Sequence, residues 1–250
     1  LFGVKIRLHS AQYVFDMMSK LHHEFGVRHI MFYDDHFVVN QARVLALSKM
    51  LQEAKMDLTW ACMSTVKVTK EVLVAMKKAG CVSVAYGIES GSQRILKILN
   101  KPINLDEARR ALKWTHEAGM RTRGFFIIAN PGETPEDMRM TLDFSLTSEQ
   151  DDFWLAYFTP FPGSAVFKDI DKYGSYEFDI RKLTLYDLVF VPTGLTKEEI
   201  VKFRTYAHRR FYFRPRIFWA YFKTFLLYPE YFWRVMKVSF NIFSMFGTEQ

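Results

Sequence analysis

The sequence predicts an α/β fold built on a parallel sheet, and two patterns support this. Short apolar runs alternate with segments whose apolar residues recur at helical spacing. The runs begin near residues 27, 58, 82, 121 and 153, so each strand-and-helix unit takes about 25–40 residues. This alternation is typical of crossover units, in which each helix returns the chain to the same end of the sheet. The pattern alone leaves a barrel and a doubly wound sheet open.

Residues that typically begin and end helices mark the predicted helices in the first half of the chain. Ser10 and Thr69 are residues that cap helix N-termini, and Gly26 and Gly80 are typical stop residues. Two lysines precede Gly80, where they complement the C-terminal dipole of the helix. The predicted order is helix 10–26, strand 27–33, helix 40–51, strand 58–62 and helix 69–80.

Residues that typically begin and end helices also mark the strand–helix units in the second part of this domain. Asn104 with Glu107 makes a start that resembles a capping box, and Gly119 ends that helix. Thr134 is followed by Pro135 at the first helical position. The predicted order is strand 82–86, helix 93–99, helix 104–118, strand 121–129, a helix from 134 and strand 153–158.

The pattern changes after about residue 175, and we predict two domains. Residues 1–175 form the strand–helix domain. Residues 176–250 form a C-terminal helical region, because 196–199 read as a helix start and 204–246 are rich in Phe, Tyr, Trp and Arg.

Composition excludes several classes of protein. Hydrophobic residues make up 49% of 250, which excludes a disordered chain. Two cysteines are too few for a disulfide framework and favour a reducing cytoplasm. No apolar run approaches the length of about 20 residues that spans a bilayer. The net charge of +7 gathers near 204–216, so we predict no nucleic-acid partner. The first residue is Leu, and we interpret the chain as part of a longer protein.

Polar or small residues follow four of the predicted strands. In a repeating strand–helix protein these ends share one face, where ligands bind. Each corner taken alone also fits a turn or a helix cap. Four of them on one face favour a ligand site: Asp34-Asp35, Glu89-Ser90, Asn130 to Glu133, and Thr159 to Gly163.

An ordered set of short motifs resembles the radical S-adenosylmethionine (radical SAM) domain of cobalamin-binding radical SAM proteins. The resemblance covers roughly residues 3 to 170. The motifs are Tyr33-Asp34-Asp35-His36-Phe37, Trp60-x-Cys62, Lys77-Lys78-Ala79-Gly80-Cys81, Gly87 to Ser92, Pro131-Gly132-Glu133-Thr134 and Pro160-Phe161-Pro162-Gly163.

The resemblance implies a partial (βα)6-type parallel barrel whose first strand is missing here, with the C-terminal helical appendage. It implies a radical SAM enzyme, a cobalamin-dependent methyltransferase or cyclase that acts on a small metabolite or lipid. The implied cofactors of the full-length protein are S-adenosylmethionine, a [4Fe–4S] cluster and cobalamin, and an electron donor is an implied partner. We expect a cytoplasmic protein.

The resemblance also implies which residues bind S-adenosylmethionine. The end of the family's fourth strand contacts the ribose or methionyl part, and its fifth strand runs beside the adenine. We expect Arg123 to pair with the methionyl carboxylate or to lie on the outside, and Asp34 and Asp35 to lie toward substrate. The cofactor-binding candidates are Gly87, Glu89, Ser90, Arg123, Phe126, Ile128, Asn130, Pro131 and Gly132.

The chain departs from the family where the cluster should bind. The motif Cys-x-x-x-Cys-x-x-Cys is absent, so we assign no metal ligand and no catalytic residue. Cys62 and Cys81 are expected in the core, and Met63 and Thr65 replace residues common in the family. The missing motif reflects truncation or degeneration, and we expect this chain alone to be inactive.

Two rival functions remain at this stage. One is a (βα)-barrel enzyme without a cluster, and the other is a degenerate barrel that serves as a nucleotide-binding or scaffold module. The stretch 211–219, which mixes aromatic and basic residues, packs on the protein or else meets an anionic membrane surface peripherally.

Overall fold

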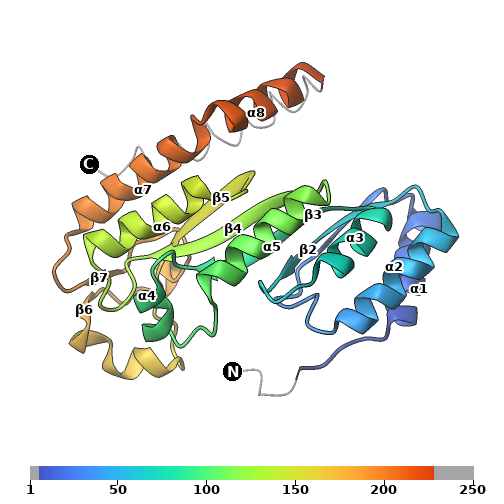
Figure 1. The fold of residues 1–250 in the computed structure, drawn as a ribbon. Helices are drawn as coiled ribbons and strands as arrows, with labels where there is room; N and C mark the ends of the chain where they lie inside the picture. Colours follow the sequence, from blue (N-terminus) through green and yellow to red (C-terminus); the bar gives the residue numbers. More distant parts are fainter. Residues whose placement is uncertain (1–5, 228–250) are drawn as a thin grey trace. The chain divides into compact units, whose positions relative to one another are not determined.

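The computed structural model describes residues 6–227. Its main feature is a sheet of five parallel strands in the order β1-β2-β3-β4-β5 (Figure 1). Because strand order follows chain order, each helix crosses over on the same face of the sheet. This is the arrangement of an open parallel barrel, and it confirms the predicted α/β class. The strands are β1 (His29–Phe32), β2 (Thr59–Ser64), β3 (Cys81–Glu89), β4 (Arg121–Ile128) and β5 (Asp152–Tyr157).

The helices begin at the polar residues that the sequence marks. Ser10, Asn40, Thr69 and Asn104 each accept a hydrogen bond from a backbone N–H of the first turn. Gly26 ends the first helix in the left-handed conformation, with φ 66°. Helix α1 (Ala11–Phe25) precedes β1, and the helices between strands are α2 (Gln41–Ala54), α3 (Lys70–Lys78), α4 (Gln93–Ile98), α5 (Leu105–Glu117) and α6 (Pro135–Thr147).

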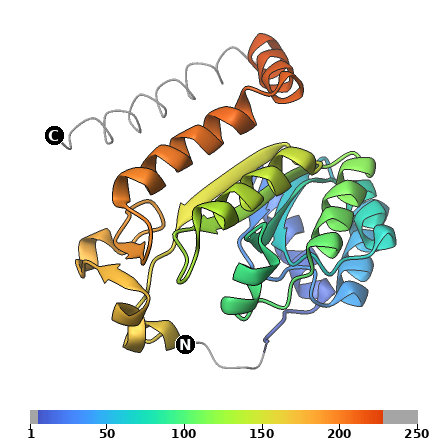
Figure 2. The ribbon, with the colours of Figure 1, turned by 60° about the vertical axis from the view of Figure 1, so that its left-hand side comes forward.

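One face of the sheet packs against these helices (Figure 2). In β4 the residues Thr122, Gly124, Phe126 and Ile128 are buried, and the alternating residues are half-buried or exposed. Phe126 packs against Phe144 of α6, with ring centroids 6.1 Å apart. The alternation in β4 therefore divides the sheet into a helix-covered face and an inner face.

The core between β2, the β1 loop and α3 is centred on Trp60. Trp60 is fully buried, and its indole N–H donates to the Ala79 carbonyl at 2.7 Å. Phe37 packs against it with centroids 5.6 Å apart. Cys62 and Cys81 are both free and buried, which confirms their predicted place in the core.

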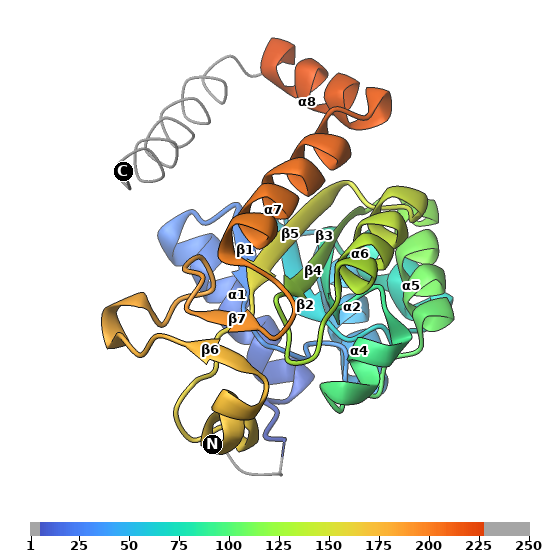
Figure 3. The same cartoon turned by 90° about the vertical axis from the view of Figure 1, so that its left-hand side faces the viewer.

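The segment after β5 contains elements that the sequence analysis does not anticipate. Two short 3-10 helices and an antiparallel strand pair follow β5, and Figure 3 shows this pair at the side of the molecule away from α5. Strands of three residues leave almost no periodicity to recognise. These elements are η1 (Ala165–Lys172), β6 (Gly174–Tyr176), η2 (Ile180–Lys182) and β7 (Phe190–Pro192).

The described chain ends in α7 (Lys197–Tyr212) and α8 (Pro215–Leu227). Backbone contacts divide the chain into two compact units, with the boundary between Thr205 and Tyr206. The predicted boundary between 175 and 176 stays a prediction, and the part of the tail beyond residue 227 lies outside the described residues. Within residues 6–227, none of the helices has the length and apolarity needed to cross a membrane.

The first unit includes the start of α7, which covers the free edge of β5. Arg204 donates from Nε to the Leu155 carbonyl at 3.0 Å, and its guanidinium lies 4.5 Å from the centre of the Tyr157 ring. A carbonyl at a sheet edge is a potential partner for a foreign strand. Arg204 therefore protects this edge from pairing with another chain.

Candidate functional site

The carboxyl ends of all five parallel strands meet at one edge of the sheet, as the sequence predicts. Two neighbouring strands carry most of the predicted site residues at this edge. We call the residues from Glu89 to Ser92 the β3 corner and those from Ala129 to Thr134 the β4 corner. Gly87 pairs with Phe125, and Glu89 pairs with Phe126 across a β-bulge, so the two corners lie side by side.

The β3 corner begins with a strained glutamate. Glu89 has φ 72°, in the left-handed region that disfavours residues with a Cβ. Its carboxylate is 16% exposed and pairs with Lys101, with Nζ 2.9 Å from Oε1. Its neighbours thus hold Glu89 in a backbone conformation that is unfavourable for a residue with a Cβ. Such strained residues are concentrated at functional sites.

The β4 corner has the same kind of strain. Ala129 is fully buried with φ 62°. The next residue, Asn130, donates its backbone N–H to Glu133 Oε2 at 2.9 Å and its side-chain amide to the Ile127 carbonyl at 2.8 Å. Pro131 and Gly132 complete the turn, and Gly132 has φ 70°. Two adjacent strands therefore end in non-glycine residues with left-handed backbone.

Two buried oxygens at the β4 corner lack a hydrogen-bond partner within the described chain. They are Asn130 Oδ1 and Glu133 Oε1, on side chains that are at most 1% exposed. Buried polar atoms are normally paired, and an exception calls for an explanation such as a ligand or a water. Amino and hydroxyl groups of a nucleoside are donors that would satisfy such oxygens. The β4 corner therefore holds two buried oxygens that no donor of the described residues satisfies.

Glu133 is the most perturbed carboxyl group at this edge. Burial is the main cause that raises its pKa to about 8, and the charge of Asp137 adds to the rise. Hydrogen bonds from Asn130 offset part of the effect. At neutral pH the carboxyl group is therefore largely protonated, so Glu133 can donate as well as accept.

Glu133 should make the stability of the chain depend on pH. Its folded pKa is about 8 against an ordinary value of 4.5, so the stability it contributes is complete below about pH 4.5 and is lost as the pH rises through 8. We expect Glu133→Gln to remove this loss. The stability of the variant relative to wild type should rise by up to about 1.4 kcal/mol per pH unit between pH 5 and 8. Urea unfolding at three pH values measures this difference.

The control for that measurement is Glu136→Gln. Glu136 lies three residues further along the chain, in the first turn of α6, where it is exposed and pairs with Arg139. Its removal should leave the pH dependence of unfolding unchanged. Parallel pH profiles for wild type and Glu133→Gln would show that Glu133 is already ionised in the folded protein at pH 5.

Three of the predicted cofactor-binding residues lie elsewhere on β4. Arg123 is near the start of the strand, on the inner face, and donates from Nε to Asp152 Oδ2 at 2.6 Å. The side chains of Phe126 and Ile128 are fully buried on the helix-covered face. Only the backbone of these two residues is placed to border a ligand. A role of Arg123 at the strand ends requires it to leave Asp152, and it stays a prediction.

The predicted substrate-side residues stand at the same edge, two strands away. Asp34 and Asp35 follow β1 and are exposed. Phe37, just beyond them, donates its backbone N–H to the Met63 carbonyl at 3.2 Å, which ties this loop to the end of β2. Both aspartates are therefore accessible from solvent at the ligand-binding edge.

Sequence reasoning missed the residues that support the corners. Lys101 contacts the corners from the loop after α4, Arg94 from α4 and Thr141 from α6. Their signal is weak because each is an ordinary helix or loop residue in the sequence. The spacing of Thr134 and Asp137 does mark a capping box, but it does not reveal the further contacts of Asp137.

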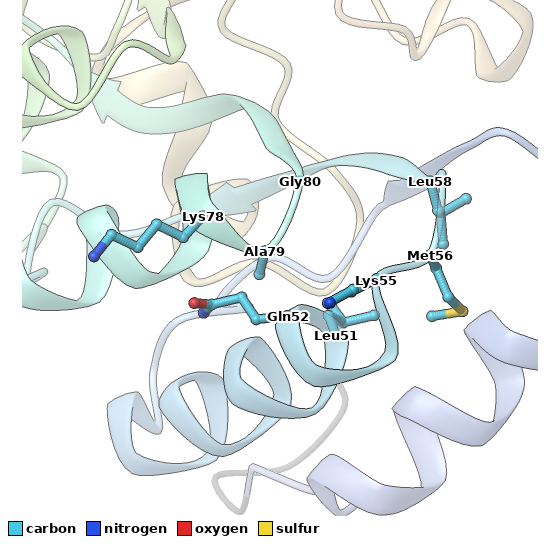
Figure 4. A pocket seen from close by; sticks show the side chains of 8 residues that line it. All are labelled: Leu51, Gln52, Lys55, Met56, Leu58, Lys78, Ala79 and Gly80. Atoms are coloured by element: carbon cyan, nitrogen blue, oxygen red, sulfur yellow. The ribbon is translucent and has the colours of Figure 1, made fainter.

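Two cavities lie at opposite edges of the sheet. One, of about 520 Å³, lies beside the β3 corner and is lined by residues that include Lys67, Lys97 and Lys101. The other, of about 290 Å³, lies at the amino ends of the strands between the ends of α2 and α3 (Figure 4). That end of a barrel of this kind usually serves stability rather than chemistry. The first cavity therefore lies at the same edge of the sheet as the two corners, and the second lies at the opposite edge.

The residues of this chain do not fit an iron–sulfur cluster. The described residues contain no group of three or more His, Cys, Asp or Glu side chains arranged to hold a metal ion. The full sequence has two cysteines, and both are buried. The neighbouring Cys81 thiol and, second, burial raise the pKa of the Cys62 thiol, which opposes the thiolate form that binds metals. We therefore expect that this chain alone holds no cluster.

Known proteins resemble this chain in sequence. The chain is 34% identical to an uncharacterized methyltransferase of Pyrococcus horikoshii over 86% of its own length and 48% of that protein. It is 26% identical to an anaerobic magnesium-protoporphyrin IX monomethyl ester cyclase of Cereibacter sphaeroides, over 85% of this chain and 35% of that one. The chain thus spans about half the length, or less, of these relatives.

A solved structure has the same fold. It is the radical S-adenosylmethionine methyltransferase TsrM of Kitasatospora setae with cobalamin and a [4Fe–4S] cluster bound. The TM-score is 0.54 at 19% identity, over 59% of this chain and 31% of that one. The likeness supports the partial parallel barrel. The model of the radical SAM superfamily matches residues 2–145, and the chain belongs to that superfamily.

Proposed function

We propose that this chain forms the S-adenosylmethionine-binding side of a radical SAM enzyme, a cobalamin-dependent methyltransferase or cyclase that acts on a small metabolite or lipid. The observation that carries the proposal is the pair of strained corners with two unpartnered, buried oxygens. Membership in the superfamily supports it. Methyltransferases and a cyclase among the relatives support the reaction class.

The residues of the chain would bind and orient the cofactor. Glu89 would accept from ribose hydroxyls or from the methionyl amino group. Asn130 Oδ1 and the protonated Glu133 would meet the polar edge of the adenine, and Gly87 and Gly132 allow its close approach to the backbone. In the whole protein, cluster and cobalamin would supply the electron and methyl-group chemistry, and this chain would fix the position of the reacting carbon.

We further propose that an electron donor reduces the cluster of the whole protein and that the protein acts in the cytoplasm. Phe213 and Trp219 of the second unit are 73% and 55% exposed, which supports peripheral membrane contact as the route to a lipid-type substrate.

Replacing Glu89 tests the proposed binding role. Saturation-transfer NMR with S-adenosylmethionine and this chain measures binding even when it is weak. We expect Glu89→Ala to weaken the affinity by roughly 10- to 150-fold, because a hydrogen bond to a charged group contributes about 1.5–3 kcal/mol. Glu53→Ala, which removes an exposed carboxylate of α2, should leave the affinity unchanged.

Lys101→Met separates binding by Glu89 from its role in shaping the corner. If Glu89 contacts the ligand directly, freeing it from Lys101 should keep the affinity within about threefold of wild type. Equal losses in Glu89→Ala and Lys101→Met would mean that the ion pair shapes the corner and that Glu89 does not bind the ligand.

A further inference from the structure

We propose that Arg94 and Asp137 are positioning residues that fasten the β3 corner to the β4 corner and so fix the spacing between the two halves of the cofactor site. The inference rests on the proposed function, because it concerns the same two corners. Neither side chain belongs to the turns themselves. Arg94 lies on α4 and Asp137 on α6, so each reaches across from a helix.

Asp137 holds both corners with one carboxylate. Its Oδ1 accepts from the Ser92 hydroxyl, the last residue of the β3 corner, at 2.6 Å. Its Oδ2 accepts from the backbone N–H and the hydroxyl of Thr134 at 3.0 and 2.6 Å, which fixes the end of the β4 corner. The carboxylate therefore bridges the two corners through three neutral donors.

Arg94 completes the bridge from the other helix. It forms a two-point contact with Asp137, through Nε to Oδ1 and Nη2 to Oδ2. The same Nη2 donates to the Gly132 carbonyl at 2.9 Å, inside the β4 corner. An arginine fork fixes direction as well as distance, which a lysine cannot do.

The charge state of Asp137 suits this role. Burial favours its neutral form, but the hydrogen bonds from Arg94, Ser92 and Thr134 outweigh burial and hold its pKa well below the usual value. Its side chain is only 5% exposed, whereas that of Arg94 is 51% exposed. The bridge therefore stays charged throughout the neutral range, and its buried half is shielded from salt.

A capping role alone does not account for these contacts. A capping box needs the Thr134 and Asp137 side chains and nothing more. Here the same carboxylate also binds Ser92 and Arg94. The β3 corner is further seated on α6 because Thr141 Oγ1 accepts the Gly91 N–H at 3.0 Å. These contacts join both corners to α6, and Arg94 adds a link from α4 to the same carboxylate.

The test compares a ligand that spans both corners with one that touches a single corner. S-adenosylmethionine spans both, and adenine alone would border only β4. Arg94→Met should weaken S-adenosylmethionine binding about tenfold and change adenine binding less than twofold, because misplacement penalises only a ligand that must satisfy two sites at once. Equal losses for the two ligands, or no loss for either, would overturn the proposal that the Arg94–Asp137 pair, which we call the clamp, fixes the spacing of the two corners. Affinities are measured by saturation-transfer NMR.

Hydrogen exchange tests, without any ligand, whether Arg94 and Asp137 couple the two corners. In Arg94→Met the amides of residues 90–92 and 132–134 should exchange faster together. The control Arg139→Met removes another arginine–carboxylate pair of α6 that touches neither corner, and exchange at both should stay as in wild type. Acceleration at one corner only, or the same acceleration in the control, would overturn the clamp.

The two measurements keep the clamp separate from the proposed function. If wild type binds no S-adenosylmethionine, the proposed function fails, and hydrogen exchange still decides whether the corners are coupled. If Arg94→Met does not fold, Arg94→Lys serves in its place. It keeps the charge and loses the fork, so it should show the same joint acceleration at a smaller amplitude.

Discussion

Gly91→Ala is expected to destabilise the chain by about 3 kcal/mol or more, the largest effect of any single methyl group at the site. An added Cβ would lie 2.5 Å from the Met140 carbonyl oxygen and 2.6 Å from the Thr141 Cα. Both atoms belong to the backbone of α6 and cannot move aside as a side chain can. The β3 corner would have to leave the helix, and urea unfolding measures the cost.

Gly87→Ala is the matched control on the same strand. An added Cβ there would meet only Glu89 Oε1, at 3.4 Å, and the φ of Gly87 lies outside the left-handed region that favours glycine. We expect a change in stability of less than about 1 kcal/mol. Equal stability of Gly91→Ala and wild type would show that the corner does not rest on α6 as described.

Anaerobic reconstitution with iron and sulfide should leave this chain without a [4Fe–4S] cluster. A cluster of this kind in the family needs three closely spaced thiolates, and the sequence offers two cysteines, both buried in the sheet. Iron analysis after desalting should therefore find well under one iron per chain. The double variant Cys62→Ser/Cys81→Ser should behave in the same way.

A stable cluster absorbance with about two to four irons per chain would contradict this expectation. About two irons per chain would mean that two chains share one cluster, and about four would mean that other side chains replace the missing thiolates. Loss of that iron in the double cysteine variant would distinguish the first explanation from the second.

The sequence predicted the main sheet well because its signals are local. Capping residues such as Ser10 and Thr134 act on their own first turns, and the apolar runs mark buried strands whatever their partners. The same reasoning missed β6 and β7. Strands of three residues show no period, and their pairing depends on residues about sixteen positions apart.

The candidate site was only partly predictable for a related reason. The corners themselves carry turn residues that the sequence displays, such as Gly91 and Gly132. Several supporting contacts join residues that are far apart in the sequence, 43 positions between Arg94 and Asp137 and 50 between Gly91 and Thr141. For Arg123, the alternation of residues along β4 predicts which face of the sheet its side chain lies on. It does not predict the ion pair with Asp152.

An amide chemical-shift map of the labelled chain with and without S-adenosylmethionine tests most directly whether the two corners form the cofactor site. We expect perturbations at Gly87, Gly91, Asn130 and Gly132, which border the two corners. We expect no change at Lys78 and Gly80, which line the cavity at the opposite edge of the sheet in Figure 4. Shifts confined to that opposite edge, or no shifts at saturating ligand, would contradict the claim that the β3 and β4 corners form the cofactor site.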